Sequence, residues 1–116
     1  MTKTISNPQG GTPAYKLYQS GSLVSTAAYA QIGIQYRAGY KKTLIYLRET
    51  GGAESFMYRI QLGITQTILE TIKTDVSVAA SGTAYETLTD AWPWVKVDII
   101  DDSGHATVWC YIVSES

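Results

Sequence analysis

The chain has 116 residues, which is enough for one domain with a sizeable core. Apolar residues make up 45% and charged residues 16%, so the composition excludes a disordered chain, and the net charge of −1 removes the basic excess that nucleic-acid or membrane-surface binding needs. The single cysteine excludes an internal disulfide framework and any cysteine-built zinc site.

The first segment, residues 1–13, is rich in turn-forming residues, with two prolines and two glycines between positions 8 and 13. We expect it to be a flexible N-terminal arm, which either stays disordered or orders against a neighbouring subunit, and we place a single domain at 14–116. The arm does not resemble a signal peptide, and the chain contains no apolar run near the ~20 residues that cross a bilayer. We therefore expect a protein made in a cytoplasm.

The next segments alternate with a period of two, which is typical of β-strands. The apolar residues Ala30, Ile32, Ile34, Tyr36 and Ala38 alternate with a mainly polar set, which predicts one apolar face. The segment Thr43–Thr50 contains a continuous apolar run, as a central strand buried on both faces would. Gly51-Gly52 follows, and then a new alternation from Phe56 to Ile64, so these two segments predict a β-hairpin.

A weaker alternation covers Ile68–Val78, where Glu70 and Thr74 interrupt the apolar parity and predict a bulge, a bend or an exposed end. The threonines and isoleucines favour a strand over the competing helix across 66–73. A short strand is expected over Thr83–Thr89.

Trp92-Pro93-Trp94 opens the last predicted hairpin, which turns at 101–104 and returns through 106–113. About seven or eight short strands without a convincing helix predict an all-β fold: an antiparallel β-sandwich, jelly-roll-like in style.

Few residues suit catalysis. His105 and Cys110 lie ~16 Å apart along one predicted strand, too far for a nucleophile–base pair. The cluster Asp98, Asp101 and Asp102 near one turn leaves a weak calcium site open, although no EF-hand pattern is present. We expect no catalytic set, cofactor or metal. A hydrolase that uses two carboxylates is the weaker hypothesis, and its unranked candidates are Glu49, Glu54, Glu70, Glu86 and Asp98.

The aromatic residues carry more information, because nine tyrosines and three tryptophans stand against one phenylalanine. Tyrosine and tryptophan are favoured at subunit interfaces and sugar-binding faces, where one end of the ring stays wet. On the last strand, a core face of Val108, Cys110 and Ile112 leaves Trp109, Tyr111 and Val113 directed outward. That face is covered by a second sheet or loop, is a subunit interface, or is a ligand platform, and Trp92 and Trp94 carry the same ambiguity.

The stretch Leu88–Ile99, the glycine-containing turn and the strand Ala106–Val113 resemble the closing hairpin of small β-sandwich structural proteins of tailed bacteriophages. The features that carry the resemblance are an aromatic-Pro-aromatic start, a Val-x-Val strand and a glycine-led return strand of alternating valine and tyrosine. The resemblance implies a non-enzymatic virion component, either a head decoration (cementing) protein or a tail accessory subunit.

Such proteins assemble as homo-oligomers, often trimers, and bind the major capsid protein or another virion protein rather than nucleic acid or membrane. The expected interface is Trp109, Tyr111 and Val113, with Trp92 or Trp94 beside it. The alternative is a carbohydrate-binding β-sandwich module that stacks exposed tryptophans on sugar rings.

Overall fold

The computed structural model describes residues 16–116, so the predicted arm at 1–13 lies outside the described residues. The regular elements in this range are all β-strands. In chain order they are β1 (Lys16–Val24), β2 (Ala30–Tyr36), β3 (Lys42–Glu49), β4 (Phe56–Gly63), β5 (Leu69–Val78), β6 (Thr83–Leu88), β7 (Trp94–Asp101) and β8 (Thr107–Glu115). No helix among residues 16–116 is long and apolar enough to span a membrane.

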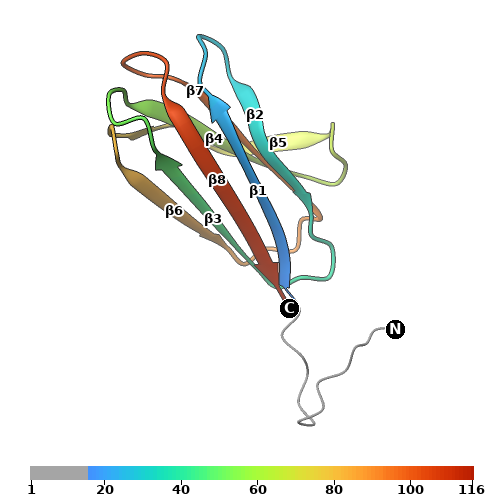
Figure 1. The fold of residues 1–116 in the computed structure, drawn as a ribbon. Helices are drawn as coiled ribbons and strands as arrows, with labels where there is room; N and C mark the ends of the chain where they lie inside the picture. Colours follow the sequence, from blue (N-terminus) through green and yellow to red (C-terminus); the bar gives the residue numbers. More distant parts are fainter. Residues whose placement is uncertain (1–15) are drawn as a thin grey trace, which may run out of the picture.

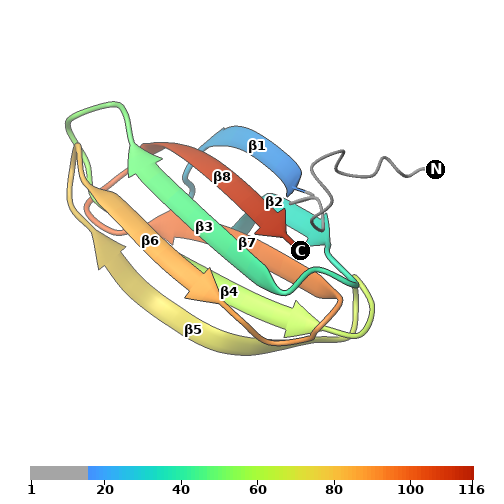
Figure 2. The same cartoon turned by 90° about the horizontal axis from the view of Figure 1, so that it is seen from below.

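The strands form two antiparallel four-stranded sheets that pack face to face (Figures 1 and 2). The first sheet has the order β1-β8-β3-β6 and the second has the order β2-β7-β4-β5. Every connection crosses from one sheet to the other except β4–β5. This is the strand order of an eight-stranded jelly roll, and it confirms the predicted all-β antiparallel sandwich.

Both predicted hairpins are wrong. β3 pairs with β8 and β6, whereas β4 pairs with β7 and β5, so Gly51-Gly52 leads into the opposite sheet. β7 and β8 are likewise in different sheets. Turn residues predict that the chain reverses direction. They do not predict whether the next strand pairs with the preceding one in the same sheet or joins the facing sheet.

The face predicted for 30–38 is wrong beyond its first half, because β2 carries a bulge. Gln31 pairs with Asp98 and Gly33 with Val97, which leaves Ile32 as the extra residue. After it the parity reverses, so Gln35 is buried while Tyr36 points out. The predicted irregularity in the 68–78 segment is confirmed: β5 is a strand, and its pairing with β4 shifts register.

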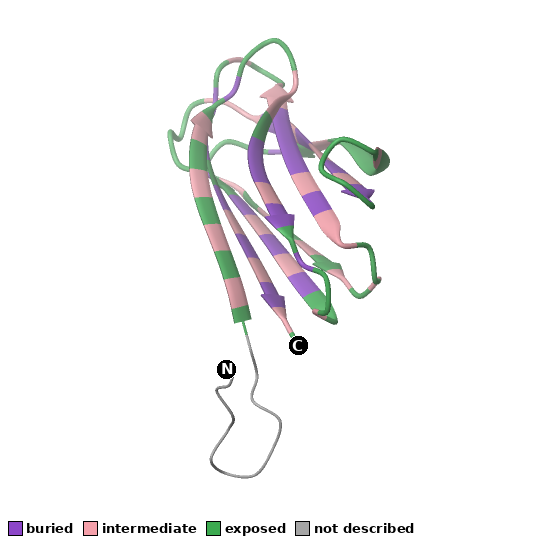
Figure 3. Cartoon of the chain, turned by 90° about the vertical axis from the view of Figure 1, so that its right-hand side faces the viewer, coloured by how far each residue is buried: buried purple, intermediate pink, exposed green. Residues whose placement is uncertain are grey.

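The core lies between the sheets and follows the alternation of the strands, visible as stripes of burial in Figure 3. β4 contributes alternate residues from Phe56 to Leu62, as predicted. β8 contributes Val108, Cys110 and Ile112, and its intervening residues face outward. β3 buries Ile45 and Leu47 fully but leaves Leu44 and Tyr46 half-buried, so it is not enclosed on both faces.

Polar networks close both ends of the core. At one end the carboxylate of Glu49 accepts backbone N–H groups from Gly51, Gly52, Ser81 and Thr107 at 2.7–3.2 Å. This ties the β3–β4 turn, the β5–β6 turn and the start of β8 together. These charge-assisted bonds outweigh the effect of burial and hold the pKa of Glu49 below its usual value.

At the other end Ser114 donates its hydroxyl to Gln35 at 2.5 Å and contacts the Thr43 hydroxyl at 2.6 Å. The buried Arg37 guanidinium donates to Thr43 at 3.1 Å and pairs with Asp90. The two sheets are therefore joined at this end by hydrogen bonds rather than by apolar contacts alone.

Candidate interaction surface

Five aromatic side chains form a band across the outer face of the first sheet. The band, called here the aromatic band, consists of Tyr18, Tyr46, Tyr85, Trp109 and Tyr111. It crosses all four strands of the sheet, with one residue each from β1, β3 and β6 and two from β8. The strand parity that buries Cys110 and Ile112 turns Trp109 and Tyr111 to the outside.

Strand register brings the rings into contact. Tyr46 on β3 lies opposite Tyr111 on β8 and opposite Tyr85 on β6. The rings of Trp109 and Tyr111 are stacked, with centroids 5.5 Å apart and planes 11° apart. The remaining centroid distances are 5.8 Å for Tyr18–Tyr111, 5.8 Å for Tyr46–Trp109 and 5.1 Å for Tyr46–Tyr85. Such cross-strand contacts hold the rings in place, so little side-chain freedom is left to lose on binding.

Three of the five rings of the aromatic band are open to solvent, and Tyr46 and Tyr111 are half-buried. Tyr85 is 64% exposed, Tyr18 is 56% exposed and Trp109 is 38% exposed. No sheet or loop formed by residues 16–116 covers these rings. Within the described residues, this excludes the interpretation that a second sheet or loop covers the outward aromatic face. A subunit interface and a ligand platform remain.

Two hollows flank the stacked pair on the same face. One, of about 310 Å³, is lined by Tyr18, Tyr111 and Val113 together with Lys16, Lys42 and Glu115. The other, of about 550 Å³, lies at the far end of the sheet. Its lining residues include Trp109, Tyr46, Arg48 and Thr50. The surface is therefore an aromatic ridge between two shallow depressions with charged rims.

Of the residues predicted for an interface, Trp109, Tyr111 and Val113 share this face. Trp92 and Trp94 do not lie beside them, which corrects that expectation. Trp94 begins β7 in the second sheet, where its ring contacts Tyr36 at 5.1 Å. Trp92 borders a third hollow with residues of the β4–β5 connection. The alternation along a strand predicts whether a side chain faces the core or the solvent, but it does not predict which of the two sheets the strand joins.

Three members of the aromatic band, Tyr18, Tyr46 and Tyr85, were not predicted. Tyr46 lies within an apolar run, which concealed its outward parity. Tyr18 and Tyr85 are on strands with weak hydrophobic alternation. Tyr18 and Tyr85 share one signal, which is that the residues two positions before and after each tyrosine are polar; this identifies an outward ring but not its neighbours, and Tyr46 lacks the signal.

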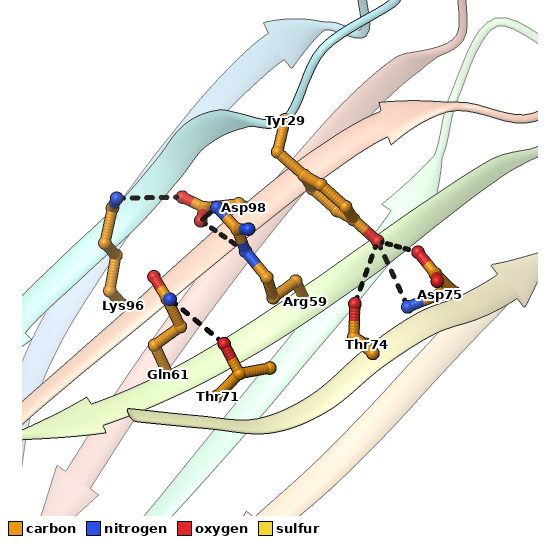
Figure 4. Close-up of polar contacts among 8 residues, drawn as sticks. All are labelled: Tyr29, Arg59, Gln61, Thr71, Thr74, Asp75, Lys96 and Asp98. Carbon is orange, nitrogen blue, oxygen red and sulfur yellow. Dashed lines mark hydrogen bonds and ion pairs between the residues drawn. The ribbon is translucent and has the colours of Figure 1, made fainter. Parts of the chain in front are cut away.

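The outer face of the second sheet is different in character (Figure 4). Arg59 donates to the Asp98 carboxylate at 2.6 and 3.0 Å, and Lys96 lies 3.5 Å from the same carboxylate. The Arg59 guanidinium lies 4.3 Å from the Tyr29 ring centroid, and the Tyr29 hydroxyl donates to Asp75. Charged pairs thus occupy the middle of this face, where the first sheet carries aromatic rings.

A serine, an aspartate and a histidine meet near the β7–β8 turn without forming a catalytic triad. The Ser25 hydroxyl donates to Asp101 at 2.6 Å and is fully buried. His105 Nδ1 lies 3.0 Å from Asp101 and 3.0 Å from the Ser25 carbonyl, so it contacts the serine backbone rather than its hydroxyl. The hydrogen bond that the protonated ring donates to the Asp101 carboxylate raises the pKa of His105. Burial raises the pKa of Cys110 to about 12, so this thiol is a poor nucleophile.

The acidic residues are engaged in separate structural contacts. Asp98 pairs with Arg59, Asp101 accepts from Ser25, and Asp102 accepts from Ser55 and Ser77. Across residues 16–116 no three metal-ligating side chains converge, so the cluster suggested for calcium does not form there. Glu86, an open candidate for acid catalysis, accepts the Tyr58 hydroxyl and pairs with Lys73.

Comparisons with known proteins describe the fold. No protein-family profile and no curated protein sequence matches the chain. A solved structure titled "Bacillus endospore appendages form a novel family of disulfide-linked pili" is similar over 99% of this chain and 98% of the other, with a TM-score of 0.60 and 16% identity. PirA is similar over 93% of this chain and 99% of its own, with a TM-score of 0.53 and 13% identity.

The Yersinia pseudotuberculosis-derived mitogen is similar over 88% of this chain and 86% of its own, with a TM-score of 0.53 and 8% identity. Such identities establish a shared small β-fold and leave the function to be argued from this chain's own surface.

Proposed function

We propose that this protein is a non-enzymatic structural subunit that assembles with copies of itself and docks onto a larger protein shell. In its specific form, the proposal is a capsid decoration (cementing) protein of a phage head, present in the virion as a homotrimer bound to the major capsid protein. The aromatic band is the observation that carries the proposal, because exposed tyrosine and tryptophan rings in one contiguous patch are what protein interfaces bury.

The size of the face supports this function. The four strands have nine, nine, eight and six residues, and at about 3.4 Å per residue and about 4.8 Å between strands they present roughly 500 Å². A stable interface buries about 800 Å² on each partner, so the first sheet supplies most of one side. A cementing protein needs nothing beyond such binding energy, because it acts by holding neighbouring shell subunits together.

The likeness to the Bacillus endospore appendage structure bears on the proposal only through the fold, because those pili are disulfide-linked. This chain has one cysteine, Cys110, and it is buried in the core. Assembly of this protein would therefore be non-covalent and would depend on the aromatic face.

The test is the solution mass by light scattering across a hundredfold dilution, followed by binding to empty phage shells. We expect a closed oligomer whose dissociation constant rises about thirtyfold or more in Trp109→Ala, as for an aromatic anchor worth about 2 kcal/mol. Met57→Ala is the matched control, since Met57 is half-buried on the outer face of the second sheet. Unchanged dissociation in Trp109→Ala would contradict the assigned face.

A monomer at every concentration would contradict self-assembly and favour the ligand platform. A polysaccharide screen read by tryptophan fluorescence then tests the carbohydrate-binding alternative. In that case Trp109→Ala should abolish the fluorescence change.

A further inference from the structure

A second apolar surface lies at one end of the other sheet. We call it the end patch, and its members are Tyr36, Ile64, Ile68, Trp92 and Trp94. Ile68, Ile64 and Tyr36 are each more than half exposed, and Trp92 is 46% exposed. A hollow of about 170 Å³ opens between Trp92 and the β4–β5 connection.

Strand register makes the end patch contiguous. Trp94 on β7 lies opposite Tyr36 on β2 and opposite Gly63 on β4. Gly63 leads directly into Ile64, and the backbone at Ile68 packs so closely on Gly63 that a side chain there would overlap it. The end patch therefore belongs to β2, β7 and the β4–β5 and β6–β7 connections, whereas the aromatic band belongs to β1, β8, β3 and β6.

We infer that copies of this chain associate head to tail, with the aromatic band of one copy seated on the end patch of the next. The inference rests on the proposed self-assembly and specifies its geometry. A two-fold dimer needs one self-complementary surface, whereas a trimer or any larger ring needs two different surfaces on each subunit. This chain has two exposed apolar surfaces on different sheets, as a ring-forming subunit requires.

Charge favours this pairing over contact between two copies of the aromatic band. The hollows beside the band carry Lys16, Lys42 and Arg48 against two acids: Glu115, which is half-buried and pairs with Lys16, and Glu49, which is buried among backbone donors. Lys42 and Arg48 have no ion-pair partner among residues 16–116. The hollow of the end patch has one charged lining residue, Glu70, which is also without an ion-pair partner in that range. Band-to-band contact would bring like charges together, and band-to-patch contact brings opposite charges together.

Complementation between two variants tests the inference. Trp109→Ala damages the aromatic band and leaves the end patch intact, and Ile68→Asp does the reverse. Both side chains are exposed enough for the fold to survive, which circular dichroism and thermal unfolding would check. Each purified variant, and an equimolar mixture with one variant fluorescently labelled, is then examined by light scattering and sedimentation.

We expect wild type to assemble and each variant alone to be monomeric. The mixture should form a discrete one-to-one dimer of twice the 12.7 kDa chain mass, because one intact band meets one intact end patch. Met57→Ala should assemble like wild type.

Two results would overturn the inference while leaving self-assembly intact. One is Ile68→Asp assembling like wild type, as a band-to-band dimer would. The other is a mixture that contains no labelled dimer. A wild type that stays monomeric throughout the dilution series would instead remove the proposed function and this inference together.

Discussion

Glu49 illustrates how single residues stabilise this sandwich. Its side chain is 1% exposed, and four backbone N–H groups from three separate segments converge on its two oxygens. A buried carboxylate without partners would be strongly unfavourable, whereas this one replaces water with fixed donors. The sequence placed Glu49 among unranked catalytic candidates, because a buried acceptor and a catalytic acid look alike until their partners are known.

Glu49→Gln should lower the free energy of unfolding by about 3 kcal/mol, since an amide presents one acceptor oxygen and repels N–H donors with its own. Urea unfolding at pH 7 measures the change. Glu54→Gln is the matched control and should stay within about 0.5 kcal/mol, because Glu54 accepts an exposed serine hydroxyl. Equal effects of the two substitutions would contradict the role given to the Glu49 contacts.

The same residue predicts a pH dependence. The folded pKa of Glu49 lies below the ordinary 4.5, so its contribution is fully present above pH 4.5 and disappears as the pH falls through the folded value. Wild type should therefore lose more stability than Glu49→Gln on acidification below pH 4.5. Parallel stability profiles of the two proteins from pH 6 to pH 3 would contradict this.

For His105 we expect the opposite dependence of folding stability on pH. Its folded pKa is raised above 6.5 by the hydrogen bond and charge of Asp101, so the contribution is present below pH 6.5 and lost as the pH rises through the folded value. Because His105 is the only histidine, one NMR titration curve reports it without ambiguity. We expect a midpoint above that of a histidine in urea-unfolded chain, and a lower midpoint in Asp101→Asn. A midpoint at or below the unfolded value would show that the Asp101 contact is absent in solution.

At the scale of elements, the alternation of apolar and polar residues predicted the strands well, but it predicted less well which face of each strand is buried. The core faces of β4, β7 and β8 follow from sequence parity, because the apolar side chains that each strand buries keep one phase. β2 does not, since one inserted residue, Ile32, exchanges the two faces. The bulge leaves no clear mark in the sequence: Gln35 and Arg37 become buried only because Ser114, Thr43 and Asp90 provide partners from distant segments.

Gly33, next to this bulge, lies against β8 from the facing sheet. A Cβ at Gly33 would stand 2.9 Å from Cδ1 of Ile112 and 3.4 Å from the Cys110 sulfur. Gly33→Ala should therefore destabilise the protein by about 1–3 kcal/mol through overpacking. Ile112→Val removes the closest atom, so the double variant should be more stable than the sum of the two single effects predicts. Strict additivity in urea unfolding would contradict this close approach.

At the scale of the whole molecule, the jelly roll could be predicted as a class but not as a strand order. Tight turns such as Gly51-Gly52 reverse the chain, and nothing local tells whether the next strand joins the same sheet or the opposite one. For the same reason, only part of the aromatic band could be predicted from the sequence. Trp109 and Tyr111 were predicted together because they share a strand, whereas Tyr46 and Tyr85 join them only through pairing across strands.

The assembled state should couple stability to concentration. If trimer formation accompanies folding, unfolding releases three chains, and each tenfold rise in protein concentration should stabilise the folded chain by about 0.9 kcal/mol, two thirds of RT ln 10. The urea midpoint of wild type should thus rise steadily over a hundredfold concentration range. In Trp109→Ala it should remain constant, because that variant unfolds as a monomer, and Met57→Ala should behave like wild type. A wild-type midpoint that does not depend on concentration would mean that the aromatic band is not buried between copies, and the exposed rings would then have to meet a different partner.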